Sequence, residues 1–198
     1  MLSRSLGLRL LLGLAIAVVV HYAAMWALPR VMMWKLFQTL TQSSGAGEAP
    51  KQPILPPLAD ASARRVVMPN PDLLYGLCAL DLARGPAIVR ADPKLSSYWS
   101  IALYASNSDH FFVLNDREAG QRPVHLRIMA QPDPTAAAAI VHPDAETRSA
   151  SLRAIDEPQT IVAPSNQVLL LMRVLVEDPS RGREALEAAR SSLKCLTS

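Results

Sequence analysis

Residues 98–104 read Tyr-Trp-Ser-Ile-Ala-Leu-Tyr, and this stretch decides the fold class. Its large apolar side chains, Trp99, Ile101 and Leu103, fall at every second position, so an extended chain points them to one face. Residues 123–129 repeat the alternation with Val, Leu and Ile against His and Arg. We therefore expect both segments to form strands that bury one face.

Further strand candidates surround these two segments. Residues 73–82 and 168–176 are apolar at both parities, as expected for central strands covered on both faces. Shorter candidates, separated by turn residues, are 65–68, 87–91, 111–115, 152–155 and 160–163. Many short strands with regular breaks predict a mostly β fold, an antiparallel β-sandwich or jelly-roll-like domain.

One α-helix is expected at the C-terminal end of this domain. Asp178 can cap its first turn, and Pro179 suits the first helical position. An apolar stripe at helical spacing follows, made of Leu186, Ala189, Leu193 and Leu196. We expect the helix to pack on the sheet.

Arg173 interrupts the apolar run of residues 168–176. A buried guanidinium without a partner is very costly, so the sequence predicts a carboxylate beside it, with Asp81 and Asp72 as the leading candidates. The alternative places Arg173 at a sheet edge, where its long side chain reaches water.

The N-terminal part of the chain has the composition of a transmembrane helix. Residues 10–28 carry no formal charge and are close in number to the ~20 that a helix needs to cross the hydrocarbon core. A cleaved signal peptide is the alternative. Signal peptides, however, have an apolar core shorter than residues 10–28, and small residues follow that core at the cleavage site. Trp34 and Lys35 suit the headgroup layer, so residues 32–40 are expected to continue along the membrane interface.

These patterns predict three parts. Residues 1–41 form the anchor and interfacial segment, residues 42–63 a linker rich in Pro, Gly, Ser and Ala, and residues 64–198 the β-rich domain. Arg4 and Arg9 precede the span, which favours a cytoplasmic N-terminus in the inner (cytoplasmic) membrane and a periplasmic domain.

The positive charge of the chain lies in the anchor. The net charge of the chain is +3, and residues 1–43 contain four basic residues and no acidic residue. The remainder therefore carries one more acidic than basic residue and has no basic stripe. Nucleic acid is not an expected partner, because binding its backbone requires such a stripe.

Five short motifs follow one another within residues 70–117. They are Asn70-Pro-Asp72-Leu-Leu-Tyr75, Asp81-Leu82, Gly85-Pro86, Tyr98-Trp99-Ser100-Ile101 and Asn115-Asp116-Arg117. As a group they resemble the bacterial family called domain of unknown function 1254, over roughly residues 66–195. Longer members of that family join this module to a second β-rich domain, the domain of unknown function 1214. The chain looks like a short, anchored branch with a separately encoded companion domain, and the resemblance implies a cell-envelope location without supplying an activity.

Polar and aromatic side chains gather in two places and are the ligand-binding candidates. The first group is Asn70, Asp72, Tyr75 and Asp81, and the second is Asn107, Asp109, Phe112, Asn115, Asp116 and Arg117, with Trp99 as a further candidate. One interpretation is a pocket in which carboxylates and an arginine orient a ligand between aromatic walls. The other is turn chemistry, with Asn70 and Asp72 bonding their own backbone and Asn115-Asp116 forming a hairpin turn.

No sequence pattern identifies a catalytic or metal centre. The chain lacks a Gly-x-Ser-x-Gly elbow, a His-Glu-x-x-His motif and a His-x-His pair, and His110, His125 and His142 are scattered. We therefore expect no catalytic residue, metal or cofactor.

Cys78 and Cys195 are the two cysteines of the chain. An outward-facing domain in an oxidising compartment tends to pair its cysteines, so we expect a disulfide that pins the terminal helix to the strand at residues 73–82. The alternative is two free thiols, with Cys78 as a small core residue.

Three functions remain open. The first is a non-catalytic envelope module whose domain pairs with another envelope protein, such as one carrying the companion domain, or binds a small ligand. The second is an envelope enzyme that uses the Asp and Tyr cluster for acid–base chemistry. The third is a purely structural protein of the cell envelope.

Overall fold

The structure, a computed structural model, describes most of the expected domain and the anchor. The described residues are 4–42, 52–59, 69–95, 97–120, 122–131, 158–176 and 183–197. The strands expected at 65–68 and 152–155, and the helix start at Asp178 and Pro179, lie outside the described residues.

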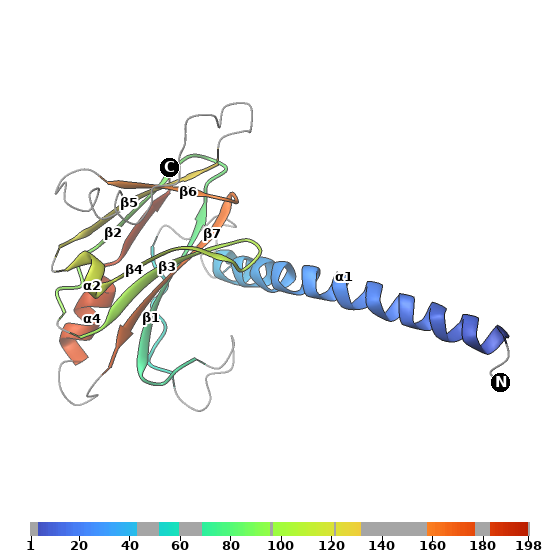
Figure 1. The fold of residues 1–198 in the computed structure, drawn as a ribbon. Coiled ribbons are helices and arrows are strands. Elements are labelled where there is room, and N and C mark those ends of the chain that lie inside the picture. Colours follow the sequence, from blue (N-terminus) through green and yellow to red (C-terminus); the bar gives the residue numbers. More distant parts are fainter. Residues whose placement is uncertain are drawn as a thin grey trace.

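Two four-stranded sheets form a β-sandwich, which confirms the predicted fold class (Figure 1). The first sheet contains, in spatial order, β1 (Leu73–Asp81), β7 (Gln167–Leu175), β3 (Trp99–Ala105) and β4 (His110–Asn115), all antiparallel. The second contains β6 (Gln159–Ala163), β5 (Val124–Ala130), β2 (Ala87–Ala91) and β8 (Lys194–Thr197). Only the β5–β6 pair among these described strands is parallel.

The alternating side chains form the core between the sheets, as the sequence predicted. Trp99, Ile101 and Leu103 project from β3 and are at most 2% exposed. Val124, Leu126 and Ile128 meet them from β5 and are equally buried. The removal of these apolar surfaces from water is the main stabilising term of such a sandwich.

β1 lies at the edge of the first sheet, whereas residues 73–82 were expected to form a central strand. Cys78 and Leu80 point into the core, and Leu77 and Ala79 contact a helix on the outer face of the sheet. Both parities are therefore apolar because a helix covers one face. The expected central position holds for β7, which lies between β1 and β3.

The helix on that face is the end of α1 (Arg4–Gln42), a continuous helix of 39 residues (Figure 1). Phe37 and Leu40 are 7% exposed and pack on Ala79 and Leu169 of the first sheet. The amino-acid sequence did not indicate this contact. One side of the segment expected along the membrane interface is thus bound to the domain.

The C-terminal helix ends earlier than predicted, and a strand follows it. α4 (Arg183–Ser191) ends before Leu193 and Leu196, and residues 194–197 form β8, which pairs with β2. Leu193 is buried in the core, whereas Leu196 is 54% exposed, so the two do not share one helical stripe. A second short helix, α2 (Asp116–Ala119), follows β4.

The predicted disulfide between Cys78 and Cys195 is present, with a Cα–Cα distance of 6.4 Å, inside the bridging limit of ~7 Å. Because Cys195 lies in β8, the bond joins the edge strands of the two sheets instead of pinning a helix. It closes a loop with a sequence separation of 117.

Candidate functional site

The strand register redistributes the two predicted groups of polar residues. Tyr75 lies opposite Arg173, Arg173 opposite Ser100, and Ser100 opposite Asn115, so these residues form one row across the first sheet. Asp81 follows Tyr75 by six strand residues, which is about 20 Å. The first group is therefore split between the two ends of β1.

The second group is split in the same way by β4. Asn107 and Asp109 lie in the turn between β3 and β4. Asn115 is the last residue of β4, and Asp116 and Arg117 follow it in α2. Six residues separate Asp109 from Asn115, again about 20 Å of strand. Neither predicted group forms one pocket.

Several of these side chains bond their own neighbouring backbone. Asn70 Oδ1 accepts from the backbone N–H of Asp72 at 2.9 Å, and the Tyr75 hydroxyl accepts from the N–H of Asn70 at 2.9 Å. Asp81 Oδ1 accepts from the N–H of Ala83 at 3.1 Å. Asn107 Oδ1 accepts from the N–H of Asp109 at 3.2 Å. For Asn70 this is the turn chemistry of the second interpretation, whereas Asp72 contributes its backbone N–H.

Asn115 caps a helix, whereas we expected a hairpin turn at Asn115-Asp116. Its side-chain oxygen accepts from the N–H groups of Arg117 and Glu118, at 3.0 and 3.1 Å, and so begins α2. The hairpin turn lies instead at the other end of β4, where the backbone N–H of Ser108 donates to the carbonyl of Ala105 at 3.0 Å.

The aromatic candidates lie inside the sandwich. Trp99 is 2% and Phe112 is 3% exposed, and both belong to the core. Arg117 is exposed, and one oxygen of Asp116 is buried without a hydrogen-bond partner. These positions do not provide two aromatic walls around an arginine.

The predicted ion pair of Arg173 with Asp81 or Asp72 is not formed in the described part of the chain. Among the described residues no carboxylate lies within ion-pair distance of Arg173, and the register places Asp81 opposite Gln167 instead. Met172 and Val174 point into the core, so the intervening Arg173 lies on the outer face of the sheet, half-buried. Its Nε is nevertheless buried without a hydrogen-bond partner among the described residues, so the side chain is only partly relieved by solvent.

Among the described residues of the domain, the buried arginine is Arg190, which sequence reasoning missed. It is 5% exposed, donates to the carbonyls of Pro56 and Tyr75, and forms an ion pair with Glu187. These contacts tie α4 to the edge of β1 and to residues 52–59. No local pattern marks this role, because Pro56 and Tyr75 are more than a hundred residues away in the chain.

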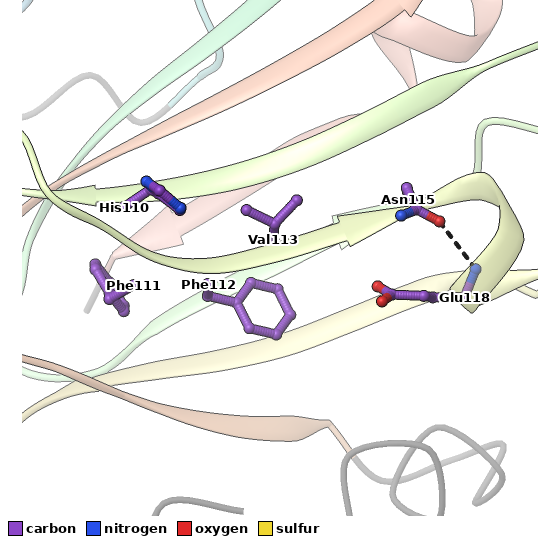
Figure 2. Close-up of a pocket in the computed structure, with 6 residues that line it drawn as sticks. All are labelled: His110, Phe111, Phe112, Val113, Asn115 and Glu118. Atoms are coloured by element: carbon purple, nitrogen blue, oxygen red, sulfur yellow. Dashed lines mark hydrogen bonds between the residues drawn. The ribbon is translucent and has the colours of Figure 1, made fainter. Parts of the chain in front are cut away.

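A shallow hollow of about 360 Å³ lies along β4 (Figure 2). Its lining residues are His110, Phe111, Phe112, Val113, Asn115 and Glu118. Glu118 and Asn115 lie together at one end, joined by the cap hydrogen bond, and His110 lies at the other (Figure 2). This lining is apolar in the middle and polar at both ends.

The main chain of β4 is open along the same hollow. The backbone carbonyl of Tyr98 accepts from the N–H of Leu175, which fixes which β3 residues direct their main-chain groups toward β7. By strand alternation, the main-chain groups of Ile101 and Leu103 point toward β4, where these residues lie opposite Leu114 and Phe112. The N–H and C=O of the intervening Val113 therefore point away from β3. Within the described ranges no segment pairs with this side of β4.

The hollow offers no arrangement for acid–base or metal chemistry. Across the part of the chain that the structure describes, no three His, Cys, Asp or Glu side chains gather as metal ligands would. What the hollow combines is an apolar strip and free backbone donors and acceptors. That combination suits an extended peptide segment.

Comparison with known proteins gives a family and a fold. Residues 51–197 match the sequence model of the family described as "Protein of unknown function (DUF1254)". No curated protein matches the chain significantly.

The solved structures that are similar to this chain include the following two. The VPA0106 protein from Vibrio parahaemolyticus has a TM-score of 0.54 and 15% identity, and the match covers 88% of this chain and 36% of that one. A putative uncharacterised protein from Burkholderia cenocepacia has a TM-score of 0.46 and 11% identity, with 92% and 50% covered. The first likeness shows the fold alone, and this chain spans about a third of that protein.

Proposed function

The chain belongs to this family of proteins of unknown function, and on that premise we propose that it is a membrane-anchored, non-catalytic module of the cell envelope whose sandwich binds a partner protein along β4. The observation that carries the proposal is the open main-chain edge of β4 beside a hollow that has apolar side chains in the middle and polar side chains at both ends. The anchor determines where this edge is presented.

α1 supports the anchor. It is long and apolar enough to cross a membrane, and none of its most apolar window is buried in the domain. Between Leu8 and Leu28 its large apolar side chains are 46–69% exposed, far more than a soluble surface normally shows. Arg30 lies 4.3 Å from the ring of Trp26, an arrangement typical of the headgroup layer.

Two features favour a periplasmic domain. Arg4 and Arg9 precede the span, and basic residues at that end favour a cytoplasmic N-terminus. The Cys78–Cys195 disulfide belongs to an oxidising compartment. Both features support the proposal that the sandwich lies on the outer side of the inner membrane.

The partner that fits β4 supplies a strand. An extended segment can hydrogen-bond to Val113 and place alternate side chains against Phe111 and Val113, as in β-strand addition. The Vibrio protein extends well beyond the region similar to this chain, so a module of this fold occurs with further chain attached to it. We propose that a companion domain from another envelope polypeptide binds here.

The enzyme hypothesis has no observation in its favour. The Asp72 backbone and the Tyr75 hydroxyl are bonded within the turn before β1, and Asp81 lies about 20 Å from Tyr75. These groups do not meet around one substrate, as general acid–base catalysis requires.

Site-specific photo-crosslinking in cells tests the proposed function. The photoreactive residue benzoylphenylalanine replaces Val113 in the full chain, and the control replaces Arg127, which is exposed on β5 of the other sheet. We expect one crosslinked envelope protein with a β-rich domain at position 113 and none at 127. No crosslink at position 113, or the same products at both positions, would contradict binding at β4.

A further inference from the structure

The turn between β3 and β4 lies against α1 well before the docked end of that helix. The Ser108 hydroxyl donates to the backbone carbonyl of Pro29 at 3.3 Å. Tyr104, four residues earlier, packs with the cluster around Phe37 and Leu40. The hairpin therefore runs beside α1 from its docked turns back toward the apolar span (Figure 1).

The contact with Pro29 sets the depth of this turn relative to a membrane. The uncharged residues 10–28 span about 28 Å as a helix, which matches the ~30 Å hydrocarbon core. Leu28 then lies at the boundary of the hydrocarbon, and Pro29 follows it immediately. The headgroup layer extends roughly 5–8 Å further on each side. Ser108, bonded to Pro29, lies within that layer.

The body of the sandwich lies further out. Phe37 and Leu40 follow Leu28 by nine and twelve residues, so they lie about 14–18 Å beyond the hydrocarbon along the helix axis. α2 and α4 lie at the end of the sandwich away from α1 (Figure 1). Of the described parts of the domain, the β3–β4 turn is the one that a contact places at the level of Pro29.

The chemistry of the turn fits the headgroup layer and no deeper position. Residues 107–110 read Asn-Ser-Asp-His, and Ser108, Asp109 and His110 are exposed. A carboxylate and unpaired backbone groups are disfavoured in hydrocarbon. In the headgroup layer, Asp109 can accept hydrogen bonds from lipid ammonium groups, and His110 can donate to lipid phosphates.

α1 by itself does not fix how deeply the chain is inserted. Val31, Met32 and Trp34 continue the apolar surface beyond Arg30 and are 50–55% exposed. A helix with such a surface can slide or tilt by several ångströms at modest cost. A polar turn held against Pro29 opposes this movement, because deeper insertion would drag Asp109 into the hydrocarbon.

We propose that residues 106–110 form a headgroup-binding tip, which rests on phospholipid headgroups and fixes the depth and tilt of the sandwich on the membrane. This inference rests on the anchor of the proposed function and adds a second membrane contact to it. It also determines that β4 begins at the membrane surface and runs away from it.

Spin labels measure the depth of the tip directly. The full chain is placed in nanodiscs of phosphatidylethanolamine and phosphatidylcholine with Ser108→Cys or His110→Cys labelled, and Glu118→Cys, at the other end of β4, is the control. Cys78 and Cys195 are buried in the disulfide and do not react. We expect several-fold greater accessibility of the two tip labels to a lipid-tethered nickel chelate than of the control label. Equal accessibility would overturn the proposal.

Two further measurements separate the causes of failure. In a flotation assay, a chain that does not float with lipid vesicles refutes the anchor and this inference together. A chain that floats but whose tip labels are no more accessible to the lipid-tethered chelate than the control label refutes the inference alone. For the depth itself, Asp109→Leu should move a label at Val31→Cys deeper into the bilayer, and Asp109→Asn, which keeps the polarity, should leave it in place. No movement with Asp109→Leu would show that the tip does not limit insertion.

Discussion

The two edges of the first sheet differ in how they end. At β1, Ile54 forms two main-chain hydrogen bonds with Leu77, of 2.8 and 2.9 Å, and Arg190 bonds the carbonyl of Tyr75. At β4, the described residues contribute no comparable partner for Val113. Unpaired strand edges invite association with other chains, and proteins usually cover them. The β1 edge is covered by three separate contacts, whereas the opposite edge, β4, is open. This difference points to binding at β4.

The sealed edge is also the edge with the covalent link. Cys78 of β1 is bonded to Cys195 of β8, so one side of the sandwich is held by a disulfide, an arginine and a piece of the predicted linker. The β4 side is held by its pairing with β3 and by core packing. We expect substitutions on the two sides to differ accordingly.

The largest effect is expected from the double change Cys78→Ala and Cys195→Ala. For a sequence separation of 117, the chain-entropy model gives about 4–5 kcal/mol of stabilisation. Urea unfolding of the full chain in detergent, followed by the β-sheet circular dichroism, measures the loss. Reduced wild-type protein is the control and should lose the same amount. A loss below about 1 kcal/mol would show that the sealed side does not depend on the disulfide.

A matched pair of proline substitutions compares the two edges themselves. Leu77→Pro removes the N–H that bonds the carbonyl of Ile54, and we expect a loss of about 3 kcal/mol. Val113→Pro removes an N–H that points away from β3, so we expect about 1 kcal/mol or less, as edge strands tolerate proline. Val113→Pro should nevertheless abolish partner binding. Equal losses of stability in the same urea assay would refute the asymmetry.

Arg190→Met tests the contact that binds α4 to the sealed edge. Loss of a buried guanidinium leaves the carbonyls of Pro56 and Tyr75 without their donor, and we expect a loss of about 2–3 kcal/mol. Arg127→Met, on an exposed position of β5, is the control and should stay within about 0.5 kcal/mol. A small loss for Arg190→Met would mean that the helix is held by packing alone.

The sequence predicted the features that depend on local periodicity. The alternation around Ile101 and Leu126 identified strands and their buried faces, because it depends on pleat geometry. The uncharged stretch at residues 10–28 likewise identified a long helix, and the two cysteines identified their own pairing.

Features that depend on distant neighbours were not accessible in this way. Apolar residues at both parities of β1 are equally compatible with a second strand and with the docked end of α1. Four residues of β8 are too few for periodicity to separate them from the preceding helix. The position of Arg173 depends on which face of β7 it occupies, and its apolar neighbours do not reveal this.

The candidate site was predicted in composition but not in arrangement. Asp81 and Tyr75 are close in sequence, yet a nine-residue strand holds them apart. For Asn115 the signal was present: an Asn followed three residues later by Glu118 is the pattern of a capped helix. Residues 107–109 read Asn-Ser-Asp, which is typical of a turn, but only the fold shows that this turn contacts α1.

The smallest effect is expected at that cap, on the open side of the sheet. Asn115→Ala removes the acceptor for the N–H groups of Arg117 and Glu118, and such a loss typically costs about 1 kcal/mol. Asn115→Asp keeps an acceptor at the N-terminus of α2 and should change stability by a few tenths of a kcal/mol at most. The urea midpoints of the two variants measure the difference. Because α2 borders the hollow, Asn115→Ala should also weaken crosslinking at position 113 more than Asn115→Asp does. Identical crosslinking in both variants would show that the partner contacts β4 without using this end of the hollow.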